Sequence, residues 1–520
     1  MLSSSTSVGS PEPTKSPDPD TKAFNPFSSQ HKSQKASPSQ HGLLGDAHRR
    51  FVIVTTLLSL IDPVRGEPTV HSLDSHPHDG SWKHDQLLKK ALDSFALICS
   101  TSRNGRETAS AVCLEQGRPN GSILRLARNL GASEGLISQL HDLLRDLTLV
   151  AFKEKTVKEA EPGVLLKIVT LTQDKIWSLL EKLHDPEIHT TIRRAIFDLG
   201  DVEPSSEVAR ETNFRHWVTN LPVMAPLEKV SELSLVIPHI KWASEAKWIY
   251  SEQIEAMFGI GEQDLPYWLK HVYELGRYYA AAKSLLKLAV KQPGIFTGIR
   301  VEAVEAPDPE RFSLRQDLTA LKTILTRLTK TNPMELMNKL GQTWLTDDPE
   351  ARLRKACKMV LIVHAEMQLL SFYDHNTELT PRLLFMGTSK KTCYLCHEFI
   401  SRHPLTIGVS ASHQKLYPTW MPAPCSSAVR KKHKILLWEF SRHLEQTTAR
   451  DLETRLGIRR MMTMDSTDGP SLTTTGTFSS KSHTDELSIR SIEADDKAVS
   501  ASESLEGIGE TSDFGHDRIH

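Results

Sequence analysis

The pattern His364-Ala365-Glu366, followed by Cys393-Tyr394-Leu395-Cys396, constrains this chain more than any other feature of its sequence. One histidine and two cysteines are typical zinc ligands. Three protein ligands leave a fourth position open to water, as in catalytic sites, whereas four close a structural site. Glu366 lies on the same first helical turn as the histidine, where its carboxylate would face the water. We predict that His364, Cys393 and Cys396 bind zinc and that Glu366 transfers protons.

Each half of this pattern follows a short apolar run and begins a helical one. Residues 358–363 (KMVLIV) end at His364, and apolar residues then recur at helical spacing. Residues 383–386 (LLFM) lead in the same way to Cys393, and a third run, 405–410 (LTIGVS), follows the second helix. The order strand, helix, strand, helix, strand predicts an α/β domain with parallel neighbouring strands. Both ligand pairs then lie at helix N-termini, which favour thiolate over thiol.

The combination of H-x-E and C-x-x-C is typical of zinc-dependent nucleobase deaminases. Residues 363–422 resemble the deaminase domain of a family of large fungal proteins in the cytidine deaminase-like superfamily. Residues 273–296 are similar to part of the helical N-terminal region of those proteins. The resemblance implies a mainly α-helical N-terminal region and a C-terminal α/β cytidine deaminase-like three-layer domain, a parallel-type sheet flanked by helices. It also implies zinc at the same three ligands, with Glu366 as proton shuttle.

Two departures from the family pattern bear on the site. Thr392 precedes the first cysteine, where the superfamily commonly has proline. The strand hairpin that precedes the histidine helix in the family is only half visible, because residues 347–356 (DDPEARLRKA) have the pattern of a loop and a helix. That hairpin helps to form the base pocket, so the sequence leaves the substrate class open.

Other interpretations of these residues stay open. A closed structural zinc site would recruit a fourth ligand from His397, His403, His413 or Cys425. A C-x-x-C pair is also typical of redox proteins, and the chain could hold no metal. The alternative function is a non-catalytic scaffold, in which a zinc-stabilised remnant of a deaminase anchors the helical region. An open cleft at the metal would favour the enzyme, and a filled one the scaffold.

Length and composition predict several folded units between disordered ends, since 520 residues exceed what one core usually supports. Residues 51–60 (FVIVTTLLSL) are about half a membrane span, so we expect them to be buried. Residues 295–304 (IFTGIRVEAV) are expected to lend a strand to the following domain. The predicted units are a disordered tail (1–45), a helical region (46–345, with a possible break near 200–230), a zinc deaminase-like domain (346–445), a terminal helix (446–463) and a disordered acidic Ser/Thr-rich tail (464–520).

Charge and cysteine content limit the partners and the compartment. The net charge of −1 gives no global attraction to nucleic acid, so binding to it would need a local basic patch. The six cysteines are too few and too scattered for a disulfide framework. The first twenty residues have no apolar segment of a secretory signal. We expect an intracellular protein, cytoplasmic or nuclear, without membrane association.

We therefore predict a zinc-dependent hydrolase that deaminates a cytosine- or adenine-type base in a nucleotide or in single-stranded nucleic acid. The large helical region favours a macromolecular substrate or a protein partner. His413, Tyr417 and Trp420 follow the second ligand helix and are candidates for contact with the base, since aromatic side chains stack on bases. For Trp420, packing under the zinc site is an equally open alternative.

Overall fold

The structure is a computed structural model that describes residues 40–41, 45–72, 81–118, 121–183, 232–258, 266–314 and 317–458, with scattered residues between 186 and 218. The predicted tail at 464–520 lies outside the described residues, as does the tail at 1–45 apart from residues 40–41 and 45. Most of the expected break near 200–230 also lies outside them.

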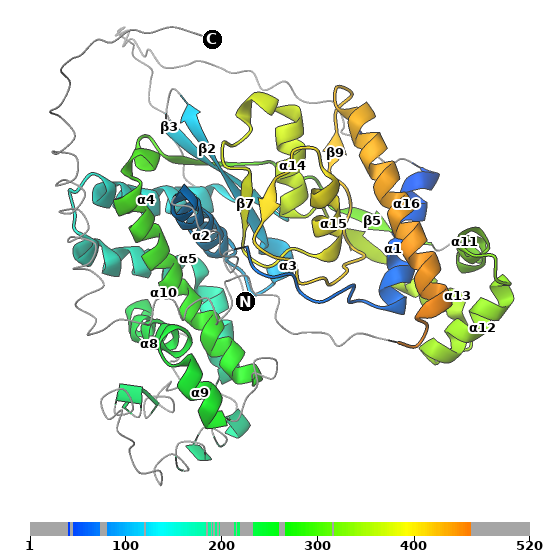
Figure 1. Ribbon diagram of the computed structural model, residues 1–520, viewed down its shortest axis with the longest axis horizontal. Helices are drawn as coiled ribbons and strands as arrows, with labels where there is room; N and C mark the ends of the chain where they lie inside the picture. The colour runs from blue at the N-terminus through cyan, green and yellow to red at the C-terminus, as the bar shows by residue number, and fades with distance from the viewer. Residues whose placement is uncertain are drawn as a thin grey trace, which may run out of the picture. The chain divides into compact units, whose positions relative to one another are not determined.

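A five-stranded mixed sheet carries the candidate site (Figure 1). Strands β2 and β3 form an antiparallel hairpin, and β2 also pairs antiparallel with β7. The two outer pairs, β3 with β4 and β7 with β8, are parallel. In spatial order the strands are β4 (Arg300–Ala303), β3 (Gly121–Arg128), β2 (Ser110–Arg118), β7 (Phe385–Thr388) and β8 (Gly408–Val409).

Helices cover both faces of this sheet, because alternate side chains of the hairpin enter two different cores. In β2, Val112 and Leu114 join the first core, while Ala111 and Cys113 join the second. The first core contains residues of α2 (Ser81–Cys99), α4 (Glu134–Ala151), α5 (Val157–Leu183), α8 (Ile237–Trp248), α9 (Ser251–Phe258) and α10 (Tyr267–Lys291). The second contains residues of α1 (Asp46–Ile61), α11 (Ala320–Leu328), α12 (Pro333–Trp344), α13 (Pro349–Ala356), α14 (Ala365–His375), α15 (Tyr394–Arg402) and α16 (Arg430–Thr454).

The short elements connect these layers. The 3-10 turns lie at helix ends, and two small strand pairs, β5 with β6 and β1 with β9, are antiparallel. These elements are α3 (Gly105–Thr108), η2 (Leu233–Val236), η3 (Pro293–Phe296), η4 (Thr377–Leu379), β1 (Gln40–His41), β5 (Glu310–Phe312), β6 (Met359–Leu361) and β9 (Pro424–Cys425).

Two of the expectations for apolar runs are confirmed. Residues 51–58 of α1 are buried, and this helix packs along α16. No helix in the described part of the chain is long and apolar enough to cross a membrane. The run at 295–304 does lend a strand, because β4 pairs with β3 from Ile123↔Arg300 to Leu126↔Ala303.

The structure differs from the expected strand order. The run at 358–363 does not pair with 383–386, because β6 pairs with β5 in a separate two-stranded sheet. The neighbour of β7 on that side is β2, the first strand of the hairpin. Residues 347–356 do form a loop and a helix, α13, as their pattern predicts. The last helix also differs, since α16 begins at Arg430 instead of residue 446.

The sheet crosses the boundary expected near residue 345. Its strands β2, β3 and β4 lie within the region expected to be helical, and β7 and β8 lie after it. Residues 129–364 therefore separate the hairpin from α14 in the sequence, although α14 packs against both strands of the hairpin. Several helices of this insertion, α4, α5, α8 and α10, pack together on the first face of the sheet.

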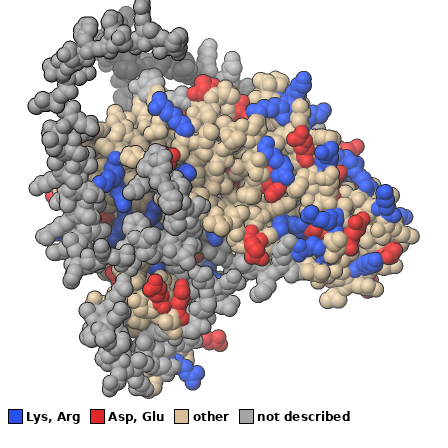
Figure 2. All heavy atoms as spheres, in the orientation of Figure 1, with Lys and Arg blue, Asp and Glu red and all other residues tan. Residues whose placement is uncertain are grey.

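Charges of both signs are interspersed on the described part of the face that Figure 2 shows. Figure 2 shows lysine and arginine beside aspartate and glutamate over the part of the visible face that α11–α13 and α16 form. This distribution agrees with the net charge of −1. A broad field of one sign is not present on this face, so any attraction for an anion must be local.

Gly387 of β7 makes the tightest approach between the sheet and its first helical layer. A Cβ added there would overlap the backbone carbon of Leu92 in α2 and lie 2.6 Å from the amide nitrogen of Asp93. We expect Gly387→Ala to destabilise the fold by about 1–3 kcal/mol, as overpacking does, and to lower the melting temperature.

The matched control is Gly135→Ala, in the first turn of α4, where an added Cβ meets nothing within 4 Å. Alanine in place of glycine in a helix is worth roughly 0.5–1 kcal/mol, so this variant should melt no lower than the parent. Equal melting temperatures for the two variants would contradict the packing of β7 on α2.

Candidate metal centre and its cleft

The end of strand β3 holds the helix start that carries His364. This residue is the N-cap of α14, with extended backbone, so the helix begins at Ala365. The Ala365 N–H donates to Asn129 Oδ1 at 2.9 Å, which satisfies one of the free donors of the first turn. The Gln368 amide donates to two carbonyls at the end of β3, at 3.0 and 3.3 Å, and to Val363 O at 2.9 Å.

A second set of hydrogen bonds holds the helix start that carries the cysteines. Cys393 is the N-cap of α15, and its Sγ accepts from the Cys396 N–H at 3.4 Å. The preceding residue, Thr392, donates to Ala411 O with its N–H at 2.9 Å and its hydroxyl at 3.1 Å. Proline at this position would have no N–H to donate. Thr392 therefore ties the ligand turn to the segment that follows β8.

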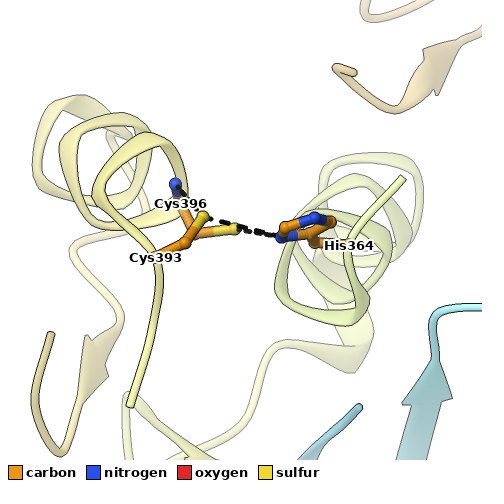
Figure 3. A group of neighbouring side chains, drawn as sticks. All are labelled: His364, Cys393 and Cys396. Atoms are coloured by element: carbon orange, nitrogen blue, oxygen red, sulfur yellow. Dashed lines mark hydrogen bonds between the residues drawn. The ribbon is translucent and has the colours of Figure 1, made fainter. Parts of the chain in front are cut away.

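The side chains of His364, Cys393 and Cys396 point toward one another from the two helix starts (Figure 3). His364 Nδ1 lies 3.6 Å from Cys393 Sγ and 3.4 Å from Cys396 Sγ. A tetrahedral zinc ion with bonds of about 2.3 Å to sulfur and about 2.0–2.1 Å to nitrogen separates these atoms by about 3.5–3.6 Å. These two distances are compatible with one tetrahedral zinc ion.

Within the described chain, this group of His, Cys, Asp and Glu donors has three members and no fourth. His397 and His403 face carboxylates, at 3.9 and 2.9 Å. The Nδ1 of His413 accepts a backbone N–H at 3.0 Å, and Cys425 lies in β9. The geometry therefore supports an open three-ligand site over a closed one.

The two thiols differ in their electrostatic surroundings. Burial alone would raise the pKa of Cys393, but hydrogen bonding from Cys396 and the charge of His364 hold its pKa well below the ordinary value. Burial raises the pKa of Cys396, and the hydrogen bond to Cys393 and its charge raise it further. Without a metal, the site therefore favours the thiolate form of Cys393 and the thiol form of Cys396. A bound cation would favour the thiolate form of Cys396 as well.

A cleft of about 190 Å³ lies beside the three donors, and His364, Glu366 and Cys393 line part of it. Glu366 is half-buried on the first turn of α14, and its carboxylate is not a member of the donor group. Burial raises the pKa of Glu366, which the charge of His364 opposes in part. A carboxylate whose pKa lies closer to neutrality is better suited to accept and return a proton.

Other walls of the cleft come from residues far from the two motifs in the sequence. Gly105, Arg106 and Ser110 lie before or at the start of β2, Asn129 follows β3, and Lys390 follows β7. Sequence reasoning missed these residues. A signal for the hairpin was present, because the sequence Pro-Asn-Gly at 119–121, which is typical of hairpin connections, separates two runs of strand-forming residues.

Two of the three candidate base-contact residues line the cleft. The rings of His413 and Tyr417 lie 5.6 Å apart, and Tyr417 is 40% exposed with its ring 6.4 Å from that of His364. Trp420 is fully buried and packs against three phenylalanine rings. This is the packing arrangement that the sequence left open for Trp420.

The protonation of His413 follows from its burial. Burial lowers the pKa of His413 to about 4, so the ring is neutral at neutral pH. Its Nδ1 accepts the Lys415 N–H at 3.0 Å, which assigns the ring proton to Nε2. The neutral ring of His413 therefore carries its one N–H donor at Nε2.

The segment that carries both motifs is similar to a known family. Residues 363–424 match the OTT_1508-like deaminase family model. The match spans both helix starts and the loop with His413 and Tyr417, but neither the hairpin nor the inserted helices. No match was found among curated proteins or among solved structures. The chain thus contains a deaminase-like segment in which a His/Cys/Cys group could hold a metal.

The metal assignment predicts about one zinc ion per chain. Cys393→Ser and Cys396→Ser should each lose most of the zinc, because each removes one of three ligands. A chelator should lower the melting temperature of the parent, since zinc bound only to the folded state stabilises it. Metal analysis of the purified variants and thermal melts with and without chelator measure both effects.

Cys425→Ala is the matched control, because Cys425 is buried like the ligands but lies outside the donor group. It should retain the zinc of the parent. Full zinc content in both serine variants would reject the ligand assignment, and zinc loss in Cys425→Ala would indicate a closed four-ligand site.

Proposed function

We propose that this protein is a zinc-dependent hydrolase that removes the exocyclic amine of a cytosine- or adenine-type base in a nucleotide or nucleic acid. One observation carries the proposal: three donors converge from two helix starts while Glu366 lies beside them in an open cleft. The deaminase family match at 363–424 supports it. The resemblance to fungal proteins of the cytidine deaminase-like superfamily supports it too.

In the proposed reaction, Glu366 carries two protons, one after the other. Zinc bound by the three donors would supply a Lewis acid that lowers the pKa of water in the cleft. Glu366 accepts the first proton as the water oxygen bonds to the amidine carbon, and delivers it to the ring nitrogen. It then carries a second proton from the added hydroxyl to the amine, the carbon–nitrogen bond breaks, and ammonia leaves.

Neighbouring residues position the base and the shuttle. Both ends of the Asn129 amide are occupied, since Oδ1 accepts from Ala365 and Nδ2 donates to Arg106 O at 2.6 Å. Asn129 therefore fixes the start of α14 against the cleft wall. The exposed ring of Tyr417 offers a face for stacking, and His413 Nε2 offers a donor to the base.

The competing function, a non-catalytic scaffold, would need the zinc ion but neither the cleft nor Glu366. A partly buried carboxylate costs free energy unless it is paired, so a purely structural site gains nothing from it. In a non-catalytic scaffold, side chains would be expected to fill the space beside the metal. Here a cleft of about 190 Å³ lies beside the donors. These two features favour the enzyme.

Replacing Glu366 separates the two functions. Glu366→Gln keeps the shape of the side chain but cannot accept a proton, so we expect ammonia release to fall by about 100- to 10,000-fold or more. Zinc content and melting temperature should stay close to those of the parent. The assay measures ammonia from nucleosides, nucleotides and single-stranded oligonucleotides that contain cytosine or adenine.

The matched control is Glu378→Ala, which removes an exposed glutamate outside the cleft and should leave ammonia release unchanged. Loss of zinc from Glu366→Gln would make Glu366 a ligand. Retained zinc with undiminished ammonia release would reject the mechanism.

A further inference from the structure

The exposed side of α16 combines positive charge with large apolar side chains. One side of this helix, drawn in orange in Figure 1, packs on α1, α11 and α15. On the opposite side, five exposed residues lie three or four positions from one another and so form one stripe. We call this stripe the basic–apolar face, and its members are Lys431, Lys434, Ile435, Trp438 and Arg442.

The apolar part of this face is large for a surface helix. Ile435 is 53% and Trp438 is 54% exposed, and the two residues are one helical turn apart. Single exposed apolar residues are common, but neighbouring ones form a surface that can bury area against a partner. The guanidinium of Arg442 lies over the Trp438 ring, 5.0 Å from its centroid. Tryptophan and arginine are the residues that most often contribute large binding energies at protein interfaces.

The positive charge of the face is not offset within the described part of the chain. No carboxylate there lies within ion-pair distance of Lys431, Lys434 or Arg442. Lys432, on another side of the same helix, does pair with Asp374 at 3.1 Å. A partner with negative charge would therefore gain attraction from the face without breaking an ion pair among the described residues.

The chemistry of the face favours an acidic protein segment with aliphatic side chains. Carboxylates would lie beside the three cations, and aliphatic groups would cover Ile435 and Trp438. A single-stranded nucleic acid could use the cations and stack on Trp438, but it would leave the aliphatic Ile435 unmatched. The mixture of charge and aliphatic surface therefore indicates a protein partner.

The chain itself contains a segment of this composition. Residues 485–496 (DELSIRSIEADD), outside the described part of the chain, have five acidic residues, one arginine and three large aliphatic residues. Residues 459–484 connect this segment to the end of the described chain and can span at most roughly 90 Å. Trp438 lies only about 24 Å before the end of α16, at 1.5 Å per residue. The segment can therefore reach the face, and its tether raises its effective concentration there.

We propose that residues 485–496 dock on the basic–apolar face of α16 in the same chain. The aliphatic side chains of the segment cover the two apolar residues of the face, and its carboxylates lie beside the three cations. This inference does not depend on the proposed reaction, because no residue of the face lines the cleft.

Zero-length crosslinking of the full chain tests the docking directly. A carbodiimide joins a lysine amine to a carboxylate in contact with it, and mass spectrometry identifies the pair. Crosslinks should join Lys431 or Lys434 to acidic residues of 485–496. In an equimolar mixture of unlabelled and isotope-labelled protein, they should join residues of the same copy. Trp438→Ala keeps both lysines and should weaken the docking, and with it the crosslink yield, about tenfold, the effect of about 1.4 kcal/mol.

The matched control is Val70→Ala, which removes an apolar side chain that is 76% exposed outside α16 and should leave the crosslink yield unchanged. Added salt should lower the yield in the parent, since salt screens exposed charges. Melting temperatures verify folding, and Ile435→Ser decides the question if Trp438→Ala does not fold.

Absence of these crosslinks, or equal yields in the parent and in Trp438→Ala, would overturn the inference. Crosslinks found only between labelled and unlabelled copies would also overturn it, and would assign the face to a second copy of the chain. Binding of single-stranded oligonucleotides that depends on Lys431 and Lys434, without the crosslinks, would assign the face to nucleic acid instead. Ammonia release tests the proposed reaction separately, and neither outcome of that assay decides the docking.

Discussion

The candidate metal centre depends on holding two helix starts at one fixed separation. His364 Nδ1 must stay within about the span of two metal bonds from both cysteine sulfurs, and it lies 3.6 and 3.4 Å from them. Neither helix can fix this spacing by itself. Asn129 and Gln368 fasten α14 to the end of β3, and Thr392 fastens α15 to the segment after β8. The donor group therefore forms only where the sheet has formed.

The sequence predicted the part of the site that local patterns encode. His364, Cys393 and Cys396 lie at helix starts next to apolar runs, so their spacing places them without knowledge of distant contacts. Asn129 was not predictable in this way, because 234 residues separate it from His364 and only the pairing of the sheet brings them together. The same long separation in sequence explains why the strand expected to pair with residues 383–386 was wrong. The place beside β7 belongs to β2, whose role no local pattern near the motifs reveals.

The segment between β3 and α14 belongs to the same fold as the candidate metal centre. Its strand β4 extends the sheet beside β3, and its helix α10 packs on α2, which itself packs on β7 at Gly387. A continuous first core joins these elements. Its helix α5 also braces the turn before the cleft wall, because Lys175 donates to Ser100 and Arg103 pairs with Glu181 at 2.8 Å. Direct contacts therefore link α5 to the turn that precedes Gly105 and Arg106 of the cleft wall.

This arrangement divides two tasks between two parts of the chain. The motif segment supplies the three donors and, in the proposed mechanism, the proton carrier Glu366. The segment between β3 and α14 supplies β4 at the sheet edge and helices that cover the first face of the sheet. The position of the donors therefore depends on hydrogen bonds at the two helix starts, whereas the sheet that anchors those starts depends on packing by helices far from the motifs in the sequence.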